Sequence, residues 1–225
     1  MLGNILNILK IKNKSTQFKD PYSFLNNVSG VIHVGANSGQ ERDEYNMYSL
    51  NVVWVEPIPK VFKKLKNNIK KYPKQRAYNF LLTNIDNQDI NFKIADNGGQ
   101  SSSILELGQH KEIWPNVKYV DSINLKSFTL ESLMKREEID IQKYQALIMD
   151  TQGSELLVLK GGSSLLKNFR YIKTEAADFE SYQGCCSIDD LSAFLETFGF
   201  KEIKKIKFAQ SEGIGSYFDV LYERK

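Results

Sequence analysis

The chain alternates between two hydrophobic periods along most of its length, and this pattern limits its fold most strongly. Short runs typical of β-strands occur at residues 30–35, 51–56, 76–82, 146–150 and 171–176. Apolar residues at helical spacing lie between and after them, at residues 60–72, 154–160 and 188–198. Strands that alternate with helices form parallel βαβ units, whose sheet is buried on both faces. The sequence therefore predicts an α/β domain built on a mostly parallel sheet.

Two further pairs of strand-like runs modify this pattern. The last pair, residues 200–208 and 216–222, flanks the turn sequence SEGIGS and predicts an antiparallel hairpin at the end of the sheet. The other pair, residues 90–95 and 117–128, brackets a polar loop, and Thr129 then marks a helix start. We interpret this second pair as an insertion beside the sheet, because it interrupts the alternation only once.

Length and composition are those of one globular domain. The chain has 225 residues, of which 41% are hydrophobic and 25% charged. We expect a single domain at residues 30–225, with an inserted loop or hairpin around residues 89–128. The net charge of +3 does not provide the concentrated basic surface that nucleic acids require, so we expect no nucleic-acid partner. We also expect no transmembrane segment, since no stretch approaches the roughly 20 apolar residues that span a bilayer.

The first 29 residues are predicted to form a helical extension of the domain. In the opening sequence MLGNILNILKIKNK the apolar residues precede the lysines, the reverse of the order in a secretory signal. Residues 1–14 therefore predict a short amphipathic helix that docks on the domain or a partner. A weak contact with a membrane surface is the alternative.

The only two cysteines, Cys185 and Cys186, are adjacent. Neighbouring cysteines rarely form a disulfide, because the required geometry strains the peptide between them. Their spacing does not suit a metal site either. The expected location is therefore the reducing cytoplasm.

The first strand-like run ends in the glycine-containing sequence VIHVGANSGQ. Gly35 and Gly39 lack a Cβ atom, so the backbone can turn sharply and a ligand can approach it closely. The N–H groups of the following helix then face the ligand. A turn that needs glycine only for packing is the alternative.

Glu56 ends the second run and lies 21 positions after Gly35. A carboxylate at this spacing can accept hydrogen bonds from ribose hydroxyls, although it could also cap the helix that follows Pro57. The turn reads Gly-x-x-x-Gly, because Ala36, Asn37 and Ser38 occupy its centre. It lacks the second glycine that makes room for a pyrophosphate, which disfavours a dinucleotide. A ribose-bearing cofactor without phosphate, such as S-adenosylmethionine, loses nothing by this.

From about residue 30 to the C-terminus the chain resembles the FkbM family of S-adenosylmethionine-dependent methyltransferases. The resemblance rests on VIHVGANSGQE, VVWVEPIP, GGQSSSILEL, SFTLESL, and LIMDTQGSELLVLKGG followed by YIKTEA. It implies a Rossmann-like class I methyltransferase fold, in which helices cover both faces of a mostly parallel seven-stranded sheet with a C-terminal antiparallel hairpin. It also implies O-methylation of a hydroxyl on a sugar, a glycan or a secondary metabolite.

The resemblance also implies contacts with the cofactor. The expected cofactor-binding residues are His33, Gly35, Ala36, Asn37, Gly39, Glu56, Thr83, Asn84 and Asp150. Of these, Glu56 is expected at the ribose, and Thr83 and Asn84 near the adenine. His33 and Asn84 stand where many class I methyltransferases have acidic residues. His33 could instead be a buried, hydrogen-bonded structural residue.

Asp150 and Glu175 are the candidate catalytic residues. Methyl transfer from a sulfonium is an in-line displacement, and a hydroxyl acceptor must also lose its proton to a base. Asp150 follows a buried run, where it could anchor the amino group of the cofactor, act as the base, or cap the helix near Gly153. Glu155 could be catalytic or could only cap and pack. Asp150, Glu175 and Asp178 could together bind a divalent cation, but we do not favour a metal.

The inserted loop and the loop after the fifth run supply the candidate substrate contacts. These are Ser101, Ser102, His110, Trp114 and Asp178. The serines predict a lid or a substrate contact, with a solvated loop as the alternative. His110 could contact the acceptor or lie on the surface. Trp114 is suited to stack on a sugar ring.

Two other functions remain open at this point. An NAD-dependent oxidoreductase would use the same glycine turn and Glu56. A non-catalytic binding module would retain the fold without the reaction. For the methyltransferase, the expected partner is a small-molecule or glycan acceptor.

Overall fold

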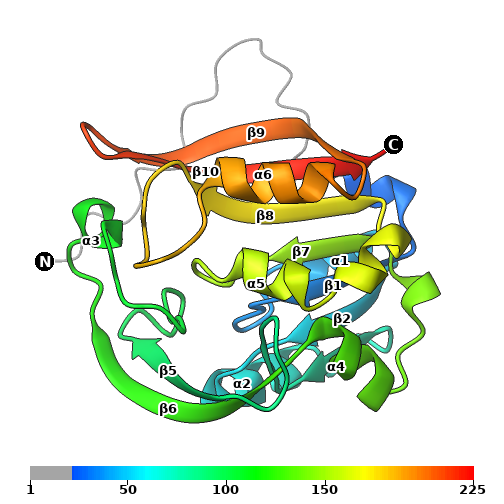
Figure 1. Ribbon diagram of the computed structural model, residues 1–225. Helices are drawn as coiled ribbons and strands as arrows, with labels where there is room; N and C mark the ends of the chain where they lie inside the picture. The colour runs from blue at the N-terminus through cyan, green and yellow to red at the C-terminus, as the bar shows by residue number, and fades with distance from the viewer. Residues whose placement is uncertain (1–21) are drawn as a thin grey trace, which may run out of the picture.

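A seven-stranded sheet forms the centre of the computed structural model, which describes residues 22–225 (Figure 1). The strands lie in the order β3 (Gln75–Tyr78), β2 (Asn51–Val55), β1 (Gly30–Val34), β7 (Ala146–Met149), β8 (Tyr171–Ala177), β10 (Gly215–Arg224) and β9 (Phe200–Ser211). Neighbours from β3 to β8 pair in parallel, and β10 pairs antiparallel with both β8 and β9. The structure thus confirms the predicted mostly parallel sheet with its C-terminal antiparallel hairpin.

Helices cover both faces of this sheet (Figure 1). They are α1 (Arg42–Met47), α2 (Pro59–Asn68), α3 (His110–Ile113), α4 (Leu130–Arg136), α5 (Glu155–Lys160) and α6 (Ile188–Glu196), with the short 3-10 helices η1 (Ser23–Asn27), η2 (Ile141–Lys143) and η3 (Ser163–Asn168). Successive strand residues point to opposite faces, so Ile32 joins the core under α4, α5 and α6. Val31 joins the core under η1, α1 and α2. Burial on both faces explains why the strands read as continuous apolar runs.

Local sequence signals set several helix starts. Thr129 caps α4, because its side chain accepts a hydrogen bond from the Ser132 N–H at 3.0 Å. Pro59 occupies the first turn of α2, where its missing N–H costs nothing. Ser187 and Asp190 form a reciprocal capping box at α6. The predicted helix start at Thr129 is therefore confirmed.

The predicted run at residues 76–82 is wrong as a single strand. The chain leaves the main sheet after β3, where the Asn79 side chain donates hydrogen bonds to the carbonyl oxygens of Glu56 and Pro57 at 2.7 and 2.9 Å. The next two residues form β4 (Leu81–Leu82), which belongs to a separate three-stranded sheet. In that sheet β6 (Tyr119–Phe128) pairs with β4 in parallel and with β5 (Asp89–Ala95) antiparallel. The insertion is thus a small sheet beside the main one.

Part of the predicted N-terminal extension belongs to the domain core. In η1, Phe24 and Leu25 are buried, and the Phe24 ring centroid lies 5.5 Å from that of Tyr171. The amphipathic helix predicted for residues 1–14 lies outside the described residues. Between residues 22 and 225, no helix is long and apolar enough to cross a membrane.

Candidate active site

A cavity of about 530 Å³ lies at the carboxyl ends of β1, β2 and β7. The order of the strands reverses between β1 and β7, and open α/β sheets bind their ligands at such a point. The predicted site residues that border the cavity are His33, Gly35, Ala36, Asn37, Glu56, Ser101, Ser102, His110, Trp114, Asp150 and Glu175. Residues far apart in the sequence therefore meet in one place, which makes this cavity the candidate active site.

The turn after β1 depends on glycine at Gly35. Its φ is 78°, and a Cβ atom there would lie 1.8 Å from the carbonyl oxygen of Asp150. Gly39 has a similar φ of 71° but does not border the cavity. A Cβ atom at Gly39 would instead lie 2.7 Å from Leu65 on α2. Gly39 therefore serves helix packing, which corrects its expected contact with the cofactor.

Glu56 lies between the cavity, the glycine turn and the start of α2. Its carboxylate borders the cavity and is only 4% exposed. It accepts hydrogen bonds from the backbone N–H groups of Asn37 and Ile58, both at 2.9 Å, so it ties the glycine turn to the start of α2. Burial raises the pKa of Glu56 to about 7, although the two N–H groups act in the opposite direction. Each carboxylate oxygen retains a lone pair for a ligand hydroxyl.

His33 lies buried beneath the glycine turn. Its Nδ1 is 3.0 Å from the Tyr45 hydroxyl, and its ring stacks on Trp54 at a centroid distance of 5.1 Å. Burial lowers the pKa of His33, which favours the neutral imidazole. The side chain thus supports the floor of the cavity as part of an aromatic cluster, while one edge of it borders the cavity.

Asp150 follows β7, Glu175 lies within the adjacent parallel strand β8, and both border the cavity. Burial raises the pKa of Asp150 to about 7. Burial also raises the pKa of Glu175 well above its usual range, and the charge of Asp150 adds to that rise. Lys173 lowers both pKa values, but its ammonium group also pairs with Asp219. Buried carboxyls with raised pKa values are suited to accept a proton.

The loop after β7 does not place Asp150 as the cap of the following helix, which was one of its possible roles. Asp150 does not cap α5, since its carboxylate accepts a hydrogen bond from the Gln152 side chain at 2.5 Å. Glu155 instead closes the loop by accepting from the backbone N–H groups of Thr151 and Gly153, at 2.8 and 3.1 Å. Glu155 does not border the main cavity, so its role is to hold the loop.

The inserted segment forms an ordered wall of the cavity. Ser102 accepts a hydrogen bond from the Ala95 N–H at 2.9 Å, and Ser101 accepts one from the Asn97 side chain at 2.9 Å. Both serines are buried. They therefore belong to a fixed wall, and the solvated loop that was the alternative is wrong.

His110 and Trp114 form an aromatic part of this wall, on and just after α3. His110 is 3% exposed, with Nδ1 2.7 Å from the Tyr217 hydroxyl, so it is not a surface residue. Its ring lies 4.9 Å from that of Trp114 and 5.1 Å from that of Tyr182. Burial lowers the pKa of His110 to about 4, so the ring is neutral at physiological pH. Its Nε2 is buried without a hydrogen-bond partner.

Thr83 and Asn84 do not border the cavity, which corrects their expected place near the adenine. The Thr83 hydroxyl donates to the Ile85 carbonyl oxygen at 3.0 Å and closes a local turn, and Asn84 is exposed. The reason is the departure of the chain from the main sheet at Asn79, which brings earlier residues to the cavity. These are Phe80, Leu81 and Leu82.

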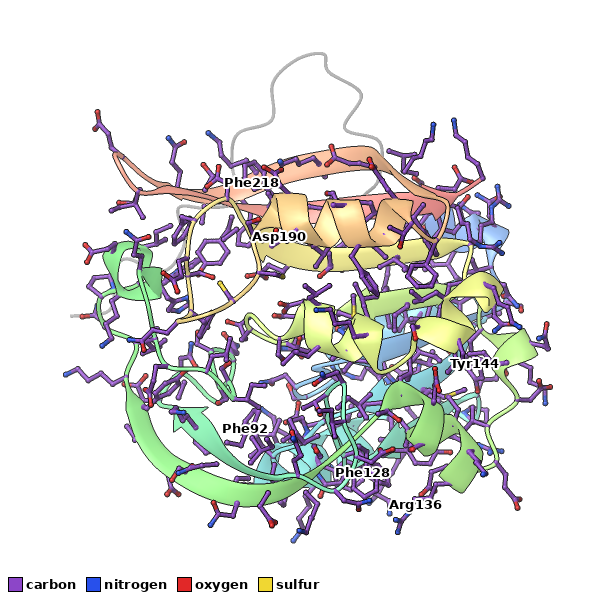
Figure 2. The ribbon with its side chains drawn as sticks, viewed as in Figure 1. Phe92, Phe128, Arg136, Tyr144, Asp190 and Phe218 are labelled. Carbon is purple, nitrogen blue, oxygen red and sulfur yellow. The ribbon has the colours of Figure 1, made fainter. Side chains whose placement is uncertain are left out.

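Figure 2 shows how this apolar part of the wall is supported, with Phe92, Phe128 and Arg136 labelled. The rings of Phe80 and Phe128 meet edge to face at 4.8 Å. The Arg136 guanidinium lies over both rings, at 5.6 and 5.4 Å from their centroids. Phe92 on β5 borders the same cavity. The result is an apolar surface suited to a flat ring.

Asp178 lies outside the cavity, although the sequence suggested that it contacts the substrate. Its carboxylate accepts a hydrogen bond from the Ser216 N–H at 2.6 Å and does not border the cavity. Asp178 therefore anchors the start of β10 and is unavailable to Asp150 and Glu175. Over residues 22–225, no group of three or more His, Cys, Asp or Glu residues is arranged to hold a metal ion.

Several cavity residues escaped the sequence argument. They are Gln40, Glu41, Pro57, Ile58, Asn97, Gln152 and Phe208. Glu41 and Gln152 stood within the motifs and could have been found from the expected turn after each strand. Phe208 gave no signal, since it reaches the cavity only through the length of the β9–β10 hairpin.

Comparison with known proteins identifies the family. The family model for the methyltransferase FkbM domain matches residues 33–202, which is well over half of the chain. The chain belongs to the FkbM methyltransferase family. Among curated proteins, this FkbM protein is similar to the 2-O-methyltransferase NoeI of Sinorhizobium fredii, with 22% identity over 176 residues that cover 75% of this chain and 71% of NoeI.

Solved structures support the fold of the FkbM protein. TrmK of M. capricolum, solved with S-adenosyl-homocysteine, matches with a TM-score of 0.52 and 9% identity, over 89% of this chain and 64% of that one. The METTL16 methyltransferase domain matches with a TM-score of 0.50 and 12% identity, over the same shares. Both are similar in the arrangement of their elements, which is the class I methyltransferase fold.

The cavity of the FkbM protein fits the cofactor of its family, S-adenosylmethionine. Glycine at Gly35 leaves the turn open, and Glu56 offers buried acceptor oxygens at the end of β2. The side chains of Glu41 and Asp150 border the same cavity, and their carboxylates favour a positively charged sulfonium and ammonium group. The protein is an S-adenosylmethionine-dependent methyltransferase, and this replaces the NAD-dependent oxidoreductase and the non-catalytic module.

Proposed function

We propose that this methyltransferase transfers the methyl group to a hydroxyl oxygen of a sugar or glycan. The observation that carries the proposal is the lining of the cavity. It combines Gly35 and the carboxylate of Glu56 with the aromatic residues His110, Trp114 and Phe208. The similarity to NoeI, a 2-O-methyltransferase, supports the choice of a hydroxyl acceptor.

The residues at the end of β1 and β2 are proposed to hold the cofactor. Ala36 and Asn37 border the cavity, and we assign the methionine part of the cofactor to their backbone. We assign the ribose hydroxyls to the Glu56 carboxylate, which is held by two backbone N–H groups. Phe80 and Leu82 offer the apolar surface for the adenine. No pyrophosphate has to fit, which suits the missing central glycine.

The cofactor supplies a methyl group on a sulfonium, which needs an in-line nucleophile. Asp150 and Glu175 border the same cavity as Gly35, Glu56 and the aromatic wall. A carboxylate with a pKa near 7 is basic enough to accept the hydroxyl proton of the acceptor and still ionised in part at neutral pH. We assign the anchoring of the cofactor's amino group and the proton transfer to this pair of carboxyls.

The aromatic wall is proposed to bind the acceptor. The apolar faces of a sugar ring pack well on aromatic rings, and Trp114 borders the cavity with its ring braced by His110 and Tyr217, at centroid distances of 4.9 and 4.8 Å. Ser101 and Ser102 add polar groups on the same wall. A ring-shaped, polar and uncharged acceptor matches this combination.

Two measurements test the proposal. Calorimetry with S-adenosyl-homocysteine should show saturable binding, whereas NAD should not bind. Purified protein should then transfer a ¹³C-methyl group from labelled S-adenosylmethionine to members of a panel of methyl pyranosides and oligosaccharides, detected as a new O-methyl resonance. Absence of S-adenosyl-homocysteine binding contradicts the proposed cofactor contacts. Cofactor binding with transfer only to phenols, amines or RNA contradicts the acceptor class.

A further inference from the structure

Gln152 lies between Asp150 and Tyr182 and is fixed at both ends. Its Nε2 donates a hydrogen bond to Oδ1 of Asp150, and its Oε1 accepts one from the Tyr182 hydroxyl, both at 2.5 Å. Its backbone has a φ of 56°, which is uncommon outside glycine, and its carbonyl oxygen accepts from the Ser103 hydroxyl at 2.8 Å. Such a conformation persists only where the surroundings enforce it.

The Gln152 amide favours the ionised form of Asp150. Its NH₂ group donates to Oδ1, and a hydrogen bond to a charged carboxylate is stronger than one to the neutral carboxyl, so the contact stabilises the negative charge. The Tyr182 hydroxyl donates to the other end of the amide and so fixes its direction. Burial raises the pKa of Tyr182, which therefore remains a protonated donor. The network therefore lowers the pKa of Asp150 and opposes the effect of burial.

Other charged groups also act on the pair, Glu41 on Asp150, Asp219 on Glu175, and Glu155 and Lys173 on both. Those that face Asp150 or Glu175 are Glu41 before α1, Glu56 after β2, Glu155 on α5, Lys173 on β8 and Asp219 on β10, with neutral His33 below. Lys173 acts on both carboxyls and is paired with Asp219. In residues 22–225, a side-chain donor reaches Asp150 through Gln152, and none reaches the carboxylate of Glu175.

From this geometry we infer that Gln152 is a positioning residue that keeps the negative charge of the carboxyl pair on Asp150, while Glu175 keeps its proton. The inference rests on the proposed function, because it assigns states to the two carboxyls named there. Gln152 occupies one oxygen of Asp150 and leaves Oδ2 for the cofactor or the acceptor. Tyr182 holds the amide and Ser103 holds the backbone of Gln152, so the inserted segment that carries Ser103 is coupled to the charge of the site.

A direct test measures the ionisation of the two carboxyls by NMR. Protein labelled with ¹³C at the aspartate and glutamate carboxyl carbons is titrated from pH 5 to 9, with S-adenosyl-homocysteine and without it. Asp150→Asn and Glu175→Gln variants assign the two resonances. We expect Asp150 to titrate at a lower pH than Glu175. In Gln152→Leu, the midpoint of Asp150 should move upward by about one pH unit, as the loss of one charge-assisted hydrogen bond implies.

A milder variant and a control variant distinguish the effect of Gln152 on Asp150 from a general loss of folding. Tyr182→Phe leaves Gln152 in place but frees its amide, so a smaller upward shift of the Asp150 midpoint is expected. Gln183→Leu is the matched control, because Gln183 is exposed and lies outside the cavity, and it should leave both midpoints in place. Far-UV circular dichroism and thermal unfolding establish that each variant is folded.

The outcomes separate this inference from the proposed function. A Glu175 midpoint below that of Asp150, or an Asp150 midpoint that does not move in folded Gln152→Leu and Tyr182→Phe, overturns the role of Gln152. Either result leaves cofactor binding and methyl transfer untouched. Failure of the protein to bind S-adenosyl-homocysteine would count against the proposed function, while the titration of the ligand-free protein would still decide the charge placement.

Discussion

The backbone of Gly35 packs directly against Asp150, since a Cβ atom on Gly35 would lie 1.8 Å from the carbonyl oxygen of that residue. This approach joins the glycine turn after β1 to the carboxylate that follows β7. The Gly35 N–H also donates to the Val55 carbonyl oxygen at 3.0 Å, which fixes the turn beside the end of β2. One glycine therefore sets the spacing of the strand ends that carry Asp150 and Glu56.

Gly35→Ala should damage both stability and cofactor binding. The side chain would meet the backbone after β7, and the φ of 78° is unfavourable for alanine, so we expect a loss of about 1–3 kcal/mol in the free energy of unfolding. The affinity for S-adenosyl-homocysteine should fall at least about tenfold, because the turn must move away from Asp150. Urea unfolding and calorimetry measure the two effects.

Gly184→Ala provides the matched control for Gly35→Ala. Gly184 has a φ of 74°, but no atom lies within 4 Å of an added Cβ. The control therefore introduces the same backbone strain without the clash, and we expect it to retain normal affinity. Equal losses of affinity in the two variants would show that the contact with Asp150 is unimportant.

The sequence was sufficient where the chemistry is local. Gly35 and Glu56 stand at strand ends that hydrophobic periodicity locates, and parallel strands bring their ends to one edge. The sequence was insufficient where a single side chain redirects the backbone. The Asn79 side chain, just after β3, donates hydrogen bonds to the carbonyl oxygens of Glu56 and Pro57, and the cavity is bordered by Phe80 and not by Thr83. Such a long-range bond has no periodic signature.

Substitutions at Phe80 and Asn84 test this correction. Phe80→Ala removes the apolar surface proposed for the adenine and should weaken binding of S-adenosyl-homocysteine by about tenfold. Asn84→Ala should leave the affinity within a factor of about two, because Asn84 is exposed and outside the cavity. Calorimetry distinguishes the pair. A larger loss in Asn84→Ala than in Phe80→Ala would restore the contact suggested by the sequence.

The buried carboxyls predict an unusual dependence of stability on pH. The pKa values of Glu56 and Asp150 rise from 4.5 and 3.8 to about 7 in the folded protein. The folded state therefore binds these protons more tightly than the unfolded state does. Their contribution to stability is present at low pH and is lost as the pH rises from about 4 through about 7. The substitution Asp150→Asn or Glu56→Gln should remove that group's share of the loss of stability with rising pH.

Thermal unfolding of the ligand-free protein measures the effect. Relative to the wild type, the midpoint of Asp150→Asn should rise between pH 5.5 and pH 8, by on the order of 2–4 °C for each kcal/mol that the amide recovers. Asp189→Asn, on the exposed surface of α6, serves as the control and should track the wild type. The difference in unfolding midpoint between Asp150→Asn and the wild type should therefore change with pH. If it does not, Asp150 has the same pKa in the folded and unfolded protein, which contradicts the prediction.

Trp114 provides the test of the aromatic wall. Trp114→Ala removes the ring proposed to stack on the acceptor. The Tyr217 ring, which packs against Trp114, remains in place. The KM for a sugar acceptor should rise about tenfold, the value of one aromatic contact, while binding of S-adenosyl-homocysteine stays within a factor of about two. Trp114→Phe keeps a smaller ring and should recover part of the loss. Steady-state kinetics with the best acceptor of the panel and calorimetry with S-adenosyl-homocysteine provide the two readouts. Equal weakening of both ligands would mean that Trp114 supports the fold of the cavity and does not contact the acceptor.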